Sequence, residues 1–263
     1  MNHLSAWKCV PTFLIASIIL LILILPIGAS TQDTKTGVLR LRVRVKVGEA
    51  TKGLSRKRFF LLPGTLEQNR ALIQSIETRP VVTRDCYYTR VGASTALLNW
   101  LKESDCESIY CREIAKEDVE GPRSVPEFVT ALNAGEKEYG SRDLARKWLP
   151  TNVPENLRDG FYKSRQTELQ GLIKQAEASS GSKVLSVMTD RNGTAYFTDL
   201  VPGSYVVSSL LSTELEAKSV IWNCEVQVKP GDLATEKPYL ISNRKDRNVK
   251  CVAVEKPLPV CEK

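Results

Sequence analysis

The sequence predicts an α+β protein, in which the strands of antiparallel β-sheets are interrupted by a mainly helical segment. Residues 38–47 alternate between apolar and basic side chains with the period of two that is typical of a half-buried strand. Residues 189–207 hold two turn signals, Asn192-Gly193 and Pro202-Gly203, between runs of β-forming residues. The intervening residues 65–179 carry helix caps and apolar residues at helical spacing.

Residues 1–29 have the pattern of a signal peptide. Positions 13–25 include only Ser17 as a polar residue, and small residues follow, with cleavage expected after Ala29. The apolar run is shorter than the roughly 20 residues that a spanning helix needs. An uncleaved anchor over residues 11–29 is the alternative, and it would be the chain's only membrane contact. Either way we expect an exported protein, whether periplasmic, secreted or extracellular.

Two strands are expected before the helical segment. In the first, leucine and valine occupy every second position of residues 38–47, and arginine or lysine occupies the positions between them. A turn over residues 48–53 leads to the second strand, residues 58–62, which ends at Pro63-Gly64.

The helical segment opens with a capping box formed by Thr65 and Gln68. Further helices are predicted over residues 93–102 and 109–119, and another is expected to start at Pro126, since proline suits the first turn of a helix. The longest covers residues 154–178 and ends at the Ser/Gly-rich residues 179–182.

Later strands are expected on both sides of the two turns. They cover residues 184–188, 204–211, 219–228, 237–241 and 248–254. The Asn192-Gly193 pair is predicted to close a hairpin, and Pro202-Gly203 is predicted to form a type II turn.

Asp190 and Asp199 are interpreted as turn residues rather than as a calcium or glycosidase carboxylate pair. Trp222 shares a strand face with valines and Cys224, which predicts a core position and argues against an aromatic sugar platform with Tyr196 and Tyr205.

The order Thr189-Asp190, Gly193, Phe197, Leu200, Pro202-Gly203 and Tyr205 resembles the carboxypeptidase regulatory-like, or transthyretin-like, β-sandwich family. The resemblance implies an antiparallel Ig-like (prealbumin-like) β-sandwich and an exported location, and it implies no particular ligand. It also implies a discontinuous sandwich domain, made of residues 37–63 and 182–256, with residues 64–181 as a mainly helical insertion.

Removal of residues 1–29 would leave no histidine and six cysteines. A chain without histidine has no Ser/His/Asp triad, no Cys/His dyad and no imidazole metal ligand, so we expect no enzyme activity, no cofactor and no metal. An even number of cysteines in an exported chain favours disulfides. Bridge candidates are Cys86, Cys106, Cys111, Cys224, Cys251 and Cys261, and Cys224 with Cys251 is the preferred pair. If all six pair, at least one bridge must join the helical segment to the β portion.

Positive charge is concentrated in residues 38–62, which hold eight basic residues and one acid, whereas the chain without residues 1–29 has 36 basic and 30 acidic residues in all. The candidate binding residues are Arg40, Arg42, Arg44, Lys46, Arg56, Lys57 and Arg58. Two structural explanations compete with binding: a charged edge strand that prevents aggregation, or a face paired with acids of the helical segment such as Glu113, Glu117, Asp118 and Glu120.

Three functions are compatible with these features. The first is a non-catalytic exported module with a structural or interaction role, and its partner would be a protein or an anionic polymer at the cell envelope. The second is a carbohydrate or anionic-polymer binding module that uses the basic strand pair. The third is a hydrolase with carboxylates or Ser/Lys in the helical segment. No nucleic-acid module is recognisable, so nucleic acid is not an expected partner.

Overall fold

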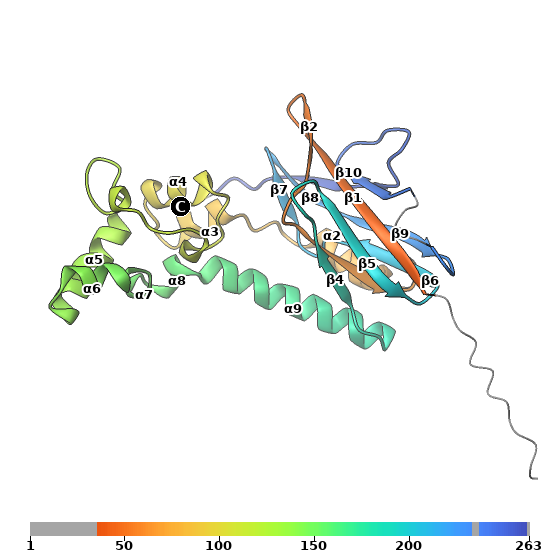
Figure 1. Cartoon of the computed structure of the whole chain (residues 1–263), viewed down its shortest axis with the longest axis horizontal. Coiled ribbons are helices and arrows are strands. Elements are labelled where there is room, and N and C mark those ends of the chain that lie inside the picture. The colour runs from red at the N-terminus through yellow and green to blue at the C-terminus, as the bar shows by residue number, and fades with distance from the viewer. Residues whose placement is uncertain (1–35, 233–236, 262–263) are drawn as a thin grey trace, which may run out of the picture. The chain divides into compact units, whose positions relative to one another are not determined.

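The computed structural model describes residues 36–232 and 237–261, so the predicted signal peptide or anchor lies outside the described residues. Among these residues the fold is α+β, with helices between the third and fourth strands and three β-sheets (Figure 1). No helix among the described residues is long and apolar enough to cross a membrane.

Sheet A is built around β1 (Gly37–Val47), whose alternating sequence places every second side chain on one face. Its strand order is β11 (Cys251–Val252), β10 (Tyr239–Ser242), β1 and β2 (Ala50–Gly53), and β5 (Thr194–Leu200) pairs with the first half of β1. β10 runs parallel to β1, whereas β2 and β5 run antiparallel to it. Strands from both ends of the chain therefore share one sheet.

Sheet B has the order β4 (Leu185–Met188), β3 (Arg58–Pro63), β6 (Gly203–Ser208) and β9 (Asn223–Val228), with antiparallel neighbours throughout. Sheet C is smaller, with β8 (Lys218–Ile221) between β12 (Val254–Pro257) and β7 (Thr213–Leu215). Chain segments before and after the helices pair in both larger sheets, since β1 pairs with β5 and β3 pairs with β4 and β6.

Sheets A and B enclose a shared apolar core. The inward residues of β1, among them Leu41 and Val43, meet Phe59 of β3, and all three are fully buried. Trp222 lies in the same core, as its strand pattern predicts, and its ring centroid is 5.7 Å from that of Phe59. The indole N–H donates a 2.8 Å hydrogen bond to the carbonyl oxygen of Ser242, so the one polar atom of this buried ring is satisfied.

Two helices cover the outer face of sheet B. They are α2 (Arg70–Thr78) and α9 (Gly160–Ser180), which pack with Phe60 and Leu62 of β3 and Val206 of β6 in a second core (Figure 1). Successive side chains of β3 point to opposite faces of sheet B, so this strand contributes to two cores, one on each face.

The other helices form a third core together with the start of α9, and this core includes Tyr88, Trp100, Phe128 and Phe161. They are α3 (Arg84–Arg90), α4 (Thr95–Glu103), α5 (Pro126–Tyr139), α6 (Arg142–Lys147), α7 (Leu149–Asn152) and α8 (Glu155–Arg158). The 21-residue α9 contributes Phe161 to this core and Leu172 to the core against sheet B, so one helix connects the two.

Several predicted elements differ in detail. Residues 109–119 contain only two 3₁₀ turns, Ile109–Cys111 and Lys116–Asp118, and the Cys106–Cys111 bridge closes a short loop at the first of them. The single strand predicted over residues 219–228 is divided between sheets C and B, with Trp222 at the division.

Both predicted turns connect different sheets, so the hairpin predicted at Asn192-Gly193 does not form. The Asn192-Gly193 turn joins β4 of sheet B to β5 of sheet A, and Asp190 stabilises it by accepting 2.8 Å hydrogen bonds from the amides of Asn192 and Thr194. Gly193 has φ 75° and its carbonyl accepts a 2.7 Å bond from Val43 N, so glycine is required by both backbone angle and close approach. The type II turn prediction is wrong, because Gly203 has no positive φ.

All six candidate cysteines are paired, as Cys86–Cys261, Cys106–Cys111 and Cys224–Cys251. The preferred Cys224–Cys251 pair is present, and it links β9 of sheet B to β11 of sheet A. The Cys86–Cys261 bridge ties α3 to the segment that follows β12. Three disulfides are typical of a protein that folds in an oxidising compartment outside the cytoplasm.

Candidate functional site

The outer face of sheet A carries a row of cations, here called the basic face: Arg40, Arg42, Arg44 and Lys46. Arg44 is exposed and the other three side chains are half-buried. β1 has hydrogen-bonded neighbours on both sides, so it is a central strand of sheet A. The edge-strand explanation of this charge pattern is therefore wrong.

Counter-charges are scarce on the basic face. Among the described residues, none of Arg40, Arg42 and Arg44 has a carboxylate within 4.0 Å, and Lys46 pairs at 3.4 Å with a fully exposed Glu49. The acids of the helical segment proposed as partners, Glu113, Glu117, Asp118 and Glu120, make no ion pair with β1, and Glu120 instead pairs with Lys116 and Arg142. The paired-face explanation is thus also wrong in the part of the chain that the structure describes.

A recess of about 400 Å³ opens at the C-terminal end of the basic face. Arg44, Lys46 and Thr51 line one side, β10 supplies Leu240 and Ser242, and the loop after β10 brings Arg244 and Lys245. The remaining lining residues are Ile241, Asp246, Asn248 and Val249. Asp246 accepts hydrogen bonds from the amides of Asn248 at 2.8 Å and Val249 at 3.2 Å, so its carboxylate holds the loop in shape.

The parallel pairing of β10 with β1 produces this recess, because Arg44 lies opposite Ser242. Asn243 then links the following loop to β1 through hydrogen bonds with the amide and carbonyl of Lys46, at 2.9 and 3.0 Å. Four cations from segments about 200 residues apart in sequence consequently line one recess. Arg244 and Lys245 were not predicted as binding residues, since nothing in the local sequence indicates that their loop reaches β1.

Tyr196 adds an aromatic ring at the other end of the basic face. It lies opposite Arg40 in the β1–β5 ladder, is 45% exposed, and its ring centroid is 5.9 Å from the guanidinium carbon of Arg40. The strand pattern argued against a sugar platform of Tyr196, Tyr205 and Trp222. That holds for the buried Trp222 and for Tyr205, whose ring packs on the core, while Tyr196 alone is presented beside cations.

The remaining candidate cations lie elsewhere. Arg58 alternates in β3 with Phe60 and Leu62, on the sheet B face that α2 and α9 cover. Lys57 lies 3.9 Å from Asp105 of the helical segment, and Arg56 occupies the connection between sheets A and B with φ 55°. The seven predicted binding residues therefore separate into a group of four on sheet A and a group of three around the start of β3.

The groups with shifted pKa values described next lie away from the basic face. At the start of α9, a hydrogen bond with Lys163 lowers the pKa of the Glu155 carboxyl, and the same contact raises the pKa of Lys163. Burial raises the pKa of Tyr88, so this phenol stays neutral and is unsuited to act as a base. Both effects strengthen the usual charge state of each group, whereas a general base or acid needs a pKa near the working pH. Among the described residues no group of histidine, cysteine or acidic side chains could hold a metal ion.

Comparisons with known proteins give little beyond this geometry. No family model matches the chain, and no curated protein matches it. A solved structure from Pseudomonas aeruginosa, described as "a putative carbohydrate binding protein", is 16% identical, and the match covers 81% of this chain and 91% of that chain. Its TM-score of 0.24 is too low to support an argument about either fold or function.

Proposed function

We propose that this chain is a non-catalytic, exported binding module that holds an anionic polysaccharide on the basic face. The observation that carries the proposal is the row of Arg40, Arg42 and Arg44 on a central strand, with no carboxylate within 4.0 Å among the described residues. A central strand needs no charge against edge-to-edge aggregation, so its cations call for another explanation.

The cations of the basic face repel one another, and a bound polyanion would offset this repulsion. Side chains on one face of a strand recur every ~6.6 Å. Two unit charges at that separation repel by about 0.6 kcal/mol in bulk water and by about 2.5 kcal/mol at the effective dielectric constant near a protein surface. A chain of negative charges laid along β1 would offset this repulsion, because each cation would then be attracted to a nearby anion.

A polysaccharide fits this surface better than a lipid bilayer does. The recess at the end of the row is concave, and eight of its eleven lining residues are polar or charged, with Leu240, Ile241 and Val249 as the apolar ones. Tyr196 offers half of its surface beside Arg40, where a sugar ring could stack while its acidic group pairs with the guanidinium. Insertion into a bilayer would instead need an exposed apolar surface.

We further propose that the β portion is a carboxypeptidase regulatory-like, Ig-like (prealbumin-like) sandwich with residues 64–181 inserted. The shared core of sheets A and B supports this assignment, as does the pairing of strands from both sides of the helices. Export through residues 1–29 would place the module at the cell envelope or outside the cell, in line with its three disulfides. A purely structural role remains the alternative.

A matched pair of triple variants tests the binding proposal. The first, Arg40→Gln with Arg42→Gln and Arg44→Gln, removes three charges from the basic face; the second, Arg56→Gln with Lys57→Gln and Arg58→Gln, removes three charges elsewhere. The probes are polygalacturonate and dextran sulfate, with neutral dextran as the control ligand, and binding is measured at low and at physiological salt.

Each cation near an anionic surface contributes about 1 kcal/mol, so the first variant should bind the polyanions roughly 100-fold more weakly at low salt. The second variant should stay within about threefold of the parent, and parental binding should fall as salt rises. Equal losses in both variants, or no loss in the first, would refute the proposal and leave the structural role. A screen of the parent on glycan and ester substrates addresses the hydrolase alternative, and turnover would contradict a non-catalytic module.

A further inference from the structure

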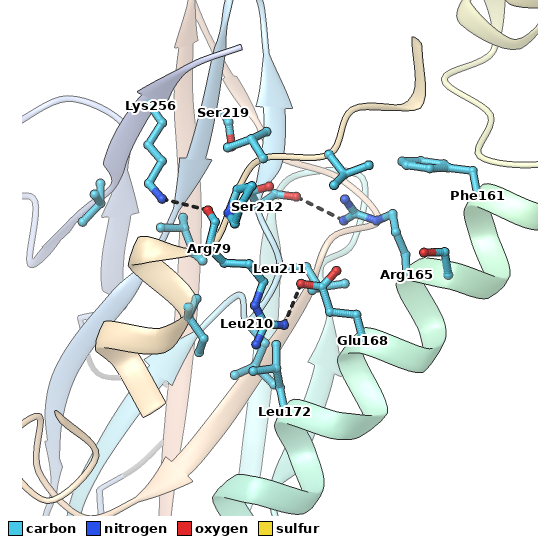
Figure 2. A pocket seen from close by; sticks show the side chains of 17 residues that line it. Arg79, Phe161, Arg165, Glu168, Leu172, Leu210, Leu211, Ser212, Ser219 and Lys256 are labelled. Atoms are coloured by element: carbon cyan, nitrogen blue, oxygen red, sulfur yellow. Dashed lines mark hydrogen bonds and ion pairs between the residues drawn. The ribbon is translucent and has the colours of Figure 1, made fainter. Parts of the chain in front are cut away.

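A small cavity of about 70 Å³ lies between α9 and sheet C, on the side of the fold that faces the helices (Figure 2). Four parts of the chain line it: the end of α2 with residues 79–82, one face of α9, residues 210–212, and β8 with β12. A water molecule needs roughly 10–15 Å³ of such space, and drug-sized pockets have 300–1,000 Å³. The cavity therefore suits a ligand of a few heavy atoms.

Three cations line this cavity, and two of them are already paired. The Arg79 guanidinium binds Glu168 at 2.8 Å. Arg165 lies 3.3 Å from a carboxylate oxygen of Glu107 and donates to the Ser212 carbonyl at 3.1 Å (Figure 2). Neither arginine needs another anion, although each retains N–H donors beyond those bonds.

Lys256 is the third cation, and its charge is not matched. Its ammonium donates one hydrogen bond of 3.1 Å to the carbonyl oxygen of Arg79, which is neutral (Figure 2). Among the described residues no carboxylate lies within 4.0 Å of it, whereas Lys218 on the neighbouring strand pairs with Glu255. An ammonium has three donors, so two remain for a ligand.

Ser219 supplies a second polar group without a partner. The residue is 2% exposed and lines the cavity, and its hydroxyl makes no hydrogen bond to another described residue. In the β8–β12 ladder Ser219 lies directly opposite Lys256, so both side chains project from the same face of sheet C. The Ser219 hydroxyl and the Lys256 ammonium can therefore both donate to one acceptor in the cavity.

Most of the other lining residues are apolar, and the polar ones among them are Ser164, Ser212 and Glu168, whose carboxylate pairs with Arg79. Phe161 and Leu172 of α9 and Leu210, Ile221 and Val254 of the β portion surround the polar groups. These side chains would contact a short hydrocarbon tail but offer nothing to a second charged group.

We propose that this cavity binds a small monocarboxylate with a short apolar tail. The carboxylate accepts hydrogen bonds from the Lys256 ammonium and the Ser219 hydroxyl, with the Arg79 side chain adjacent, and the tail lies against Ile221 and Val254, the next cross-strand pair on the same face of sheet C. The ligand supplies the negative charge and the acceptor oxygens that the described residues do not provide. This site is separate from the basic face and does not depend on polysaccharide binding.

Titration with acetate, butyrate and hexanoate, followed by NMR chemical shifts and calorimetry, tests this assignment. Butyramide has nearly the shape of butyrate without its charge, so it is the matched control ligand. We expect saturable binding of butyrate, weaker binding of acetate because its tail is shorter, and at least tenfold weaker binding of butyramide.

Two variants identify the site. Lys256→Gln should weaken butyrate binding at least tenfold and Ser219→Ala several-fold, whereas Lys218→Gln removes an equal charge from the same sheet outside the cavity and should leave binding unchanged. Far-UV circular dichroism verifies that each variant is folded, and dextran sulfate binding should not change in any of them. Absence of saturable carboxylate binding, equal losses in Lys256→Gln and Lys218→Gln, or butyramide binding as tight as that of butyrate would overturn the proposal.

Discussion

The Cys86–Cys261 bridge should contribute more to stability than either of the other disulfides. It joins α3 in the helical segment to the segment after β12, across 175 residues of sequence, and both other bridges lie within that loop. A disulfide stabilises mainly by restricting the unfolded chain, and the restriction grows with the logarithm of the loop length. The paired substitution Cys86→Ala with Cys261→Ala removes this restriction.

The magnitude follows from the loop lengths. For a separation of 175 residues the chain-entropy treatment gives about 5 kcal/mol at 25 °C. For Cys106–Cys111, with a separation of 5 residues, it gives about 2 kcal/mol, so Cys106→Ala with Cys111→Ala is the matched control. The long-loop variant should therefore lose about 3 kcal/mol more of its free energy of unfolding than the control.

Urea denaturation followed by circular dichroism measures both losses, and hydrogen exchange locates them. The long-loop variant should also exchange faster along β12 and α3, because those are the segments that the bridge connects. A control that loses as much stability as the long-loop variant would refute the argument from loop entropy. Unchanged exchange along both segments would show that the bridge does not hold them together.

Three further perturbations test the core, a turn and a buried phenol. Trp222→Phe should lower the free energy of unfolding by about 1–3 kcal/mol in urea, because it removes the indole N–H bond to the Ser242 carbonyl, which keeps only the bond from the Ala253 amide, and because it opens a cavity. Gly193→Ala should lower the free energy of unfolding by at least ~2 kcal/mol in the same assay, since its φ is 75° and a Cβ would clash with the Val43 carbonyl oxygen. A near-neutral effect would contradict the close approach of Gly193 to the Val43 backbone. Burial raises the pKa of Tyr239 to about 12, so its contribution to stability is fully present below pH 10 and is lost as the pH rises from 10 to 12. In Tyr239→Phe the free energy of unfolding should depend less steeply on pH in that window. An unchanged slope would contradict the raised pKa of Tyr239.

Local sequence patterns predicted the parts of the fold that depend on neighbouring residues. The alternation of residues 38–47 correctly separates a buried apolar side from a cationic side, since successive side chains of a strand point to opposite faces. The same rule assigned Trp222 to the core. The Cys224–Cys251 pair was also predicted, because both cysteines fall in late strands that were expected to lie close together.

Local patterns failed where a residue's role depends on which sheet its strand joins. The Asn192-Gly193 pair forms a turn as its dihedral preferences require, yet that turn connects two sheets, because β4 finds its partner in β3 and β5 finds its partner in β1. Hydrogen bonds and apolar burial between segments far apart in sequence decide such pairings, and they leave no short-range trace.

The same contrast between local patterns and long-range packing applies to the candidate sites. The sequence by itself determined that Arg40, Arg42 and Arg44 share one face, because strand periodicity alone requires it. Only the tertiary structure decided that β1 is central and that Arg244 and Lys245 reach the same recess. It also placed Lys256 opposite Ser219 in a cavity against α9. The physical reason is that periodicity determines direction along one strand, whereas neighbours across sheets and helices are set by the packing of the whole chain.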